Sequence, residues 1–206
     1  MKKYIRDEIV KYVKEHNEKQ YWREPLAAFG EDGVLFFVPF SSIVNDFNKT
    51  PEMAPENWVK ANSEADTLIK GIEEHLKSIL EDKGYEAENA QADYPLAKKA
   101  AEAGLGTIGL HNRLITSKGC SGKTGAVLVK LDVQPDGPMN DELCLYKKNG
   151  ICAVCVRNCV AQAFHEDYFD EFACREICHA NSVEDINPGD NICGKCISYS
   201  PCAYKR

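Results

Sequence analysis

The stretch AEAGLGTIGLHNRLIT, residues 101–116, decides how the rest of the chain is interpreted. Residues 104–109 read GLGTIG, which matches the G-x-G-x-x-G spelling of a dinucleotide-binding turn. Such a turn must leave a buried strand and open a helix, because the pyrophosphate binds the free N–H groups at the helix N-terminus. The elements on either side of the glycines therefore test this interpretation.

The order of these elements is the reverse of what a dinucleotide site needs. Residues 94–103 (YPLAKKAAEA) are rich in alanine and lysine and predict a helix, with Gly104 at the position of a helix-ending glycine. Residues 114–116 and 126–129 are typical of strands. We therefore reject a dinucleotide site and expect the glycines to allow a close approach of the backbone to another group.

The composition narrows the functional classes. The chain has 206 residues and a formal net charge of −7, with a pI of about 5.3, so it has no general attraction for phosphate backbones or anionic membranes. The N-terminal segment places Ile5, Ile9, Tyr12 and Val13 among charged residues, which predicts an amphipathic helix and not a signal peptide. No segment is as long and apolar as a membrane span. We expect a cytoplasmic protein without a membrane partner.

Residues 1–143 predict an α+β domain with helices packed on a sheet. The apolar run 34–38 (VLFFV) fits a strand buried on both faces. Apolar residues at helical spacing predict a long helix over about 61–83, which Gly84 ends. A further strand is expected over 125–133, and the turn cluster 135–138 (PDGP) marks a domain boundary. The second predicted domain spans residues 144–206.

The cysteines define this second domain. The chain has ten of them, and Cys120 is the only one before residue 144. In a reducing compartment so many cysteines point to metal binding or redox chemistry, because disulfide frameworks are not maintained there. The two C-x2-C pairs are compatible with zinc and with iron–sulfur clusters. The spacing is Cys144-x7-Cys152-x2-Cys155-x3-Cys159, then Cys174-x3-Cys178, then Cys193-x2-Cys196-x5-Cys202.

The flanking residues favour iron–sulfur clusters over zinc. The series Cys152-x2-Cys155-x3-Cys159 matches the last three cysteines of the bacterial ferredoxin run, and Cys144 takes the place of the missing first one. Val160 replaces the proline that usually follows that run. Two 4Fe–4S clusters need eight thiolates, as two zinc sites would, so the count alone does not separate them. The three-residue gap between Cys155 and Cys159, together with the following residues 161–164 (AQAF), resembles the corresponding helix of a ferredoxin.

Taken together, these motifs resemble the epoxyqueuosine reductase family, whose plan the cobalamin-dependent reductive dehalogenases share. The resemblance rests on A-x-A-G-L-G-x-I-G at residues 101–109, the strand ending in LIT, a glycine loop, a second strand and two cysteine sets. It covers roughly residues 30–206. It implies a nitroreductase-like, cobalamin-binding α+β domain over 1–143, followed by a ferredoxin-like domain with two 4Fe–4S clusters over 144–206.

The resemblance also implies roles for single residues. The stretch that would lie against a corrinoid comprises Gly104, Gly106, Thr107, Gly109 and His111. The cluster nearer the cobalt would be held by Cys144, Cys152, Cys155 and Cys202. The other cluster would be held by Cys159, Cys174, Cys193 and Cys196, with Cys178 as a spare that can trade places with Cys174. Cys120 is expected to be a free thiol.

The chain also departs from the family. It has Thr107 where the family usually has tryptophan and Leu110 where it has lysine. The family's proton donor is an aspartate in an Asp-x-x-Pro setting; the nearest match is Asp93-Tyr94-Pro95, two residues too close to the glycines. Asp93 and Tyr94 are the candidate general acids, and the alternative role of Asp93 is to cap a helix. The C-terminal helical extension associated with a transfer RNA substrate is not expected, and the acidic pI argues against nucleic acid.

Three functions remain open. The first is a corrinoid-dependent reductase that takes electrons from a redox partner protein through two clusters and acts on a small molecule. The second is an electron-transfer protein whose α+β domain has no chemistry of its own, which the changes at Thr107 and Leu110 favour. The third is a zinc-binding interaction protein. The metal content of the protein distinguishes them.

Overall fold

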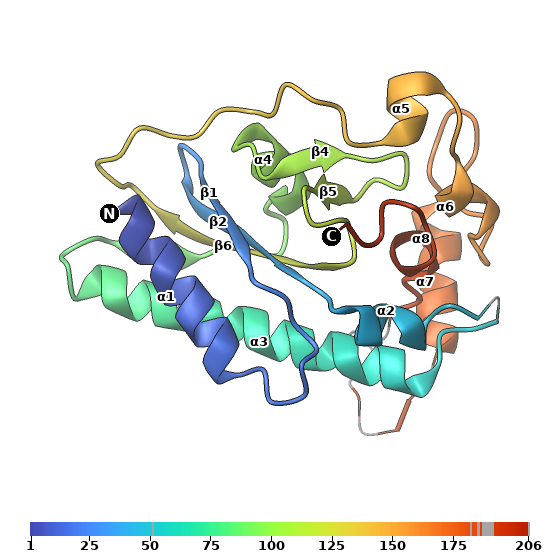
Figure 1. The fold of residues 1–206 in the computed structure, drawn as a ribbon, viewed down its shortest axis with the longest axis horizontal. Coiled ribbons are helices and arrows are strands. Elements are labelled where there is room, and N and C mark those ends of the chain that lie inside the picture. Colours follow the sequence, from blue (N-terminus) through green and yellow to red (C-terminus); the bar gives the residue numbers. More distant parts are fainter. Residues whose placement is uncertain (51, 182, 185, 187–191, 206) are drawn as a thin grey trace.

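The fold is built on a four-stranded antiparallel sheet that lies between two layers (Figure 1). The structure is a computed structural model that describes residues 1–50, 52–181, 183, 184, 186 and 192–205. In spatial order the strands are β1 (Leu26–Phe29), β2 (Gly33–Pro39), β6 (Gly122–Val129) and β3 (Ala87–Asn89). The centre of the sheet therefore joins β2 to a strand far away in the sequence, with Phe36 opposite Gly125.

Strand β2 supplies side chains to both layers. All seven of its residues are buried, which confirms the prediction of a strand buried on both faces. Because side chains alternate along a strand, Val34, Phe36 and Val38 belong to the apolar cluster of α1 and α3. Leu35 and Phe37 belong to the cluster on the opposite face, with residues of α4.

Helices α1 (Lys2–Glu15) and α3 (Glu56–Glu81) cover the first face. The predicted N-terminal amphipathic helix is present and buries Ile5, Ile9 and Val13. Helix α3 begins at Glu56, earlier than predicted, because Trp58 and Val59 extend its buried face by one turn. Gly84, at φ +84°, follows the end of α3 as expected. The short helix α2 (Ser42–Phe47) follows β2.

Helix α4 (Leu96–Glu102) and a hairpin cover the second face. Gly104, at φ +81°, turns the chain after α4, so the predicted order of helix, glycine and strand is confirmed. The first strand of the hairpin was not predicted, because it lies inside the glycine stretch itself. The two strands are β4 (Gly106–Ile108) and β5 (Leu114–Thr116).

The cysteine-rich part consists of short helices gathered at one end of the sheet (Figure 1). They are α5 (Leu145–Asn149), α6 (Val154–Arg157), α7 (Glu171–Ala180) and α8 (Lys195–Ser198). Cys144 and Ile197 belong to the same buried apolar cluster as α1 and α3. The mixed α and β architecture is as predicted. None of the helices in the described residues combines the length and the apolar character needed to cross a bilayer.

Two sets of hydrogen bonds tie the cysteine-rich part to the sheet. The backbone N–H groups of Cys120 and Ser121 donate to the carbonyls of Cys202 (2.8 Å) and Ala203 (3.0 Å), so the terminal segment lies beside the loop before β6. The buried Asn48, after α2, donates from Nδ2 to the Cys193 carbonyl and to Ser198 Oγ, both at 2.9 Å. Backbone groups and the Asn48 side chain of the sheet domain thus position the cysteine-rich part.

Candidate metal centres

Four cysteines from three segments form one group of thiols, which we call the first thiol set: Cys144, Cys152, Cys155 and Cys202. Burial, followed by the nearby thiols of Cys202, Cys144 and Cys152, raises the pKa of Cys155 to about 11. Cys144 precedes α5, Cys155 lies in α6, and Cys202 is in the terminal segment. The fold therefore brings together the four cysteines that the resemblance assigns to one cluster. Their role as ligands stays a prediction.

A second group of thiols lines a cavity of about 50 Å³ next to α6, α7 and α8. Apart from Lys195, Arg113 and His111, the wall is apolar. Burial raises the pKa of Cys196 to about 12 and also raises that of Cys193. These pKa shifts reflect a dry environment, in which anionic thiolates need a metal or a hydrogen-bond donor to compensate them. The members of this second thiol set are Cys159, Cys174, Cys178, Cys193 and Cys196.

Cys174 and Cys178 both belong to this cavity, but their surroundings differ. The thiol of Cys174 donates to Cys178 and, with the backbone N–H of Cys193 and the charge of Arg113, lowers the pKa of Cys178 to about 6. The pKa of Cys174 is raised, first by the same hydrogen bond. The contact with the backbone N–H of Cys193 thus distinguishes Cys178 from Cys174.

The two thiol sets are neighbours. Cys155 lies in α6 and Cys159 follows shortly after that helix, in the other set. The thiol of Cys155 also contributes to the raised pKa of Cys196.

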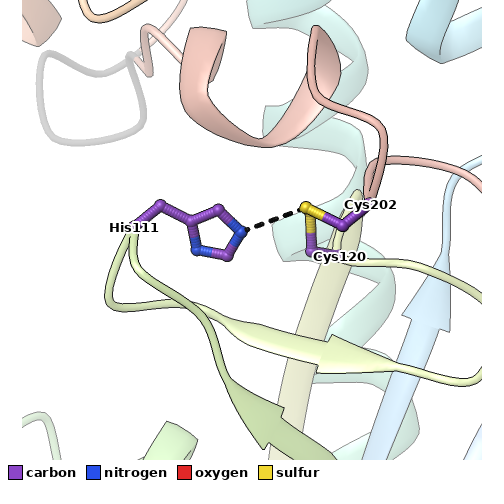
Figure 2. Close-up of side chains that lie close together, drawn as sticks. All are labelled: His111, Cys120 and Cys202. Atoms are coloured by element: carbon purple, nitrogen blue, oxygen red, sulfur yellow. Dashed lines mark hydrogen bonds between the residues drawn. The ribbon is translucent and has the colours of Figure 1, made fainter. Parts of the chain in front are cut away.

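His111 and Cys120 lie against the sulfur of Cys202 (Figure 2). The Nε2 atom of His111 is 3.6 Å from Cys202 Sγ, and Cys120 Sγ is 3.7 Å from it. Hydrogen bonds from Cys120, His111 and Ser200 lower the pKa of Cys202 to about 4. Cys120, like the other cysteines, forms no disulfide, and its pKa is raised well above the usual value by the hydrogen bond to Cys202 and by burial.

The glycines of the 104–109 stretch face the protein's own atoms. A Cβ atom at Gly104 would lie 2.2 Å from the Gly137 carbonyl oxygen, and one at Gly106 would lie 2.1 Å from the Ile115 oxygen. At Gly109 it would lie 2.8 Å from Cε1 of His111. The need for glycine at these positions is therefore explained by packing inside the protein.

Thr107 also has internal partners. Its Oγ1 donates to Glu142 Oε1 at 2.8 Å and accepts from the N–H of Leu143 at 3.1 Å. The same Glu142 oxygen accepts from the N–H of Cys144 at 2.7 Å. Thr107 therefore connects β4 to the segment that presents Cys144.

The candidate general acids lie elsewhere. Tyr94 lines a cavity of about 430 Å³ with Asp32 and Lys99, and no cysteine is among the described residues of its wall. Its hydroxyl is buried without a hydrogen-bond partner, and burial raises its pKa. Asp93 is exposed, and α4 begins after Pro95 without a side-chain cap, so the alternative that Asp93 caps this helix is wrong.

Comparison with known proteins identifies the fold. No family model matches the chain, and no curated protein matches it. The structure of epoxyqueuosine reductase from Bacillus subtilis is similar, with a TM-score of 0.54 and 12% identity over 84% of this chain and 49% of that one. The chain has an epoxyqueuosine reductase-like fold. The Streptococcus thermophilus enzyme gives a TM-score of 0.47 and 14% identity over 84% of this chain and 50% of that one. The chain thus spans about half the length of the structures it matches.

Within this epoxyqueuosine reductase-like fold, the donor atoms fit iron–sulfur clusters. Nine thiols in two adjacent, largely dry groups are the ligand type that iron–sulfur clusters use. The stretch 104–111 does not fit a corrinoid in the same way, because its glycines, Thr107 and His111 are engaged by internal contacts. A corrinoid contact at these residues stays a prediction that rests on the resemblance.

Several residues of the site could not be found from spacing. Ser200 and Cys120 reach Cys202, Glu142 holds the N–H of Cys144, and Asn48 holds the Cys193 carbonyl. Cys120 and Cys202, like Asn48 and Cys193, are far apart in the sequence and meet only after folding. Ser200 and Glu142, each two residues before the cysteine that it contacts, are the ones with a local sequence signal.

Proposed function

We propose that the chain is a cytoplasmic iron–sulfur redox protein of the epoxyqueuosine reductase-like group. It would combine a nitroreductase-like α+β domain, residues 1–143, with a ferredoxin-like domain that carries two 4Fe–4S clusters, residues 144–206. The observation that carries the proposal is the division of nine thiols into two neighbouring sets inside a fold similar to that of epoxyqueuosine reductase. Bound clusters would supply one-electron transfer.

The first cluster is assigned to Cys144, Cys152, Cys155 and Cys202. For the second, one contact supports Cys178 over Cys174 as a ligand, because the backbone N–H of Cys193 donates to Cys178, whereas Arg113 is near both thiols. The second assignment is then Cys159, Cys178, Cys193 and Cys196. The protein's part is to hold these thiolates in dry surroundings and to fix the backbone on both sides of them.

Electrons would enter at the second cluster from a redox partner protein. Large apolar side chains are exposed on this side of the molecule: Phe172, two residues before Cys174, is 74% exposed, and Tyr168 is 62% exposed. Exposed aromatic side chains of this kind are common at contact surfaces between proteins.

A small molecule would be the electron acceptor. A cavity of about 250 Å³ lies between the sheet and the cysteine-rich part, and Cys120, Ile197, Arg113 and Lys123 are among its lining residues. Its size suits a small ligand, and a ligand bound there would be near Cys120, which contacts Cys202 of the first thiol set. The negative net charge argues against a nucleic acid as the substrate.

An electron-transfer protein without a catalytic site is the second candidate. It is favoured by the internal contacts of Thr107 and by the position of Tyr94, whose cavity has no cysteine among its described lining residues. Binding of cobalamin would favour the reductase over the electron carrier, because a bound corrinoid would accept electrons from the clusters.

Metal content tests both the clusters and the corrinoid. The protein is purified anaerobically from cells supplied with corrinoid, and iron, zinc and cobalt are measured per chain. We expect roughly eight irons, as two 4Fe–4S clusters require. Stoichiometric cobalt would establish the corrinoid-dependent reductase, and iron without cobalt would support the electron carrier. Zinc without iron would refute the cluster assignment.

A further inference from the structure

The fold holds the imidazole of His111 in one orientation, directed at Cys202 (Figure 2). His111 lies in the turn between β4 and β5 and is 3% exposed. Its Nδ1 accepts a hydrogen bond from the N–H of Arg113 at 3.1 Å. Because Nδ1 is the acceptor, the ring proton of the neutral imidazole is on Nε2, which lies 3.6 Å from Cys202 Sγ.

The neighbouring residues are arranged around this ring. A side chain at Gly109 would collide with Cε1 of His111, at 2.8 Å, so the glycine leaves room for the imidazole. Cys202 is held in turn by its carbonyl, which accepts from the N–H of Cys120 at 2.8 Å. Donor and acceptor are therefore both fixed by backbone contacts, as a hydrogen bond of constant geometry requires.

We propose that His111 Nε2–H donates to the Cys202 sulfur when this sulfur binds the first cluster, and that this hydrogen bond raises the cluster's reduction potential. A hydrogen bond to a ligating sulfur withdraws negative charge from the cluster and stabilises the reduced form, which carries one more electron. The inference rests on the proposed function. It gives the first cluster a greater affinity for electrons than it would have without His111, and so favours transfer to it from the second cluster.

A mononuclear metal site is the competing interpretation of the same three residues. The ligand atoms of His111, Cys120 and Cys202 all lie within 4.8 Å of one another, and two thiolates with one imidazole are a donor set that zinc accepts. Such a site would take Cys202 away from the first thiol set and leave it with three cysteines. Our proposal keeps Cys202 in that set because a closed zinc site takes four protein ligands, and these residues supply three.

The test is a redox titration of the cluster-loaded protein, followed by electron paramagnetic resonance. His111→Leu removes the donor, and His111→Gln retains an N–H group. We expect His111→Leu to lower one of the two midpoint potentials by an amount equal to about a tenfold change in the redox equilibrium, or about 59 mV for one electron. His111→Gln should recover part of the shift. The control is His165→Leu, whose ring stacks on Tyr168 and should leave both potentials unchanged.

Four results would overturn the proposal. Unchanged potentials in His111→Leu, with roughly eight irons still bound, would refute the hydrogen bond and leave the cluster assignment intact. Loss of the same cluster in both His111 variants would show that the ring only supports the structure. A zinc ion in the native protein that disappears in Cys120→Ala would establish the mononuclear site. Absence of iron–sulfur signals from the native protein would refute the proposed function and this inference together.

Discussion

In the second thiol set, a single hydrogen bond distinguishes two cysteines that are otherwise similar. Cys174 and Cys178 lie about one turn apart on α7, and both line the cavity. Only Cys178 also accepts from the backbone N–H of Cys193, and its pKa is about 6. We favour Cys178 as the ligand because the backbone N–H of Cys193 already donates to its sulfur. The resemblance by itself favoured Cys174.

Serine substitutions test this choice. We expect Cys178→Ser to lose roughly half of the iron, because a 4Fe–4S cluster missing one thiolate is poorly held. The matched variant Cys174→Ser should keep nearly all of it. Iron and sulfide per chain, measured after anaerobic purification, give the answer. The opposite result would assign the ligand to Cys174.

At the scale of elements, sequence patterns predicted what depends on local periodicity. The buried β2, the amphipathic α1 and the long α3 follow from the pattern of apolar residues, and the short α4 follows from its alanine- and lysine-rich composition. Strand β4 could not be predicted, because the glycines in and around it carry no apolar pattern and it is defined by its pairing with β5. The same glycines suggested contact with a cofactor, whereas the Cβ positions of Gly104 and Gly106 meet carbonyl oxygens of the chain.

The β4–β5 hairpin yields a prediction about stability. Alanine at Gly106 would place a Cβ 2.1 Å from the Ile115 oxygen, so the strands must separate. We expect Gly106→Ala to lower the free energy of unfolding by about 1–3 kcal/mol, as overpacking does. Denaturant unfolding measures the loss, and it should be the same whether or not a corrinoid was supplied.

Gly137→Ala is the control for this variant, because a Cβ there has nothing within 4 Å. It should change the free energy of unfolding by less than about 0.5 kcal/mol, as is usual for an unconstrained surface site. Full stability of Gly106→Ala would contradict the packing explanation. The glycine would then be free to serve a ligand.

At the scale of the whole molecule, the cysteine-rich part is an extension of the sheet domain's core. Cys144 and Ile197 pack into the same apolar cluster as α1 and α3. Cysteine spacing indicated only that the members of each C-x2-C pair are close together, and it was the resemblance that assigned Cys202 to the set of Cys144, Cys152 and Cys155. The spacing could not show how the loops are fixed, since contacts such as Asn48 to Cys193 depend on tertiary structure.

Asn48 should therefore couple iron binding to the integrity of the whole fold. Asn48→Ala leaves the Cys193 carbonyl and Ser198 Oγ without this donor, and an unsatisfied buried group costs about 1–3 kcal/mol. We expect lower iron content and lower unfolding stability together. Asn45→Ala, which removes a bond within α2 to the Ser41 carbonyl, should leave the iron content unchanged. Equal iron loss in both variants would contradict a specific role for Asn48.

The anchoring of Cys202 beside Cys120 has a consequence for the order of assembly. All five cysteines of the second thiol set lie in the sequence between Cys155 and Cys202, so one metal-binding loop is nested inside another. A growing chain completes the inner set of ligands before it has synthesised the last ligand of the outer one. With clusters held as proposed, the outer cluster closes the longer loop and restricts the unfolded chain as a cross-link does. Maturation of the two centres would then proceed from the inside outward.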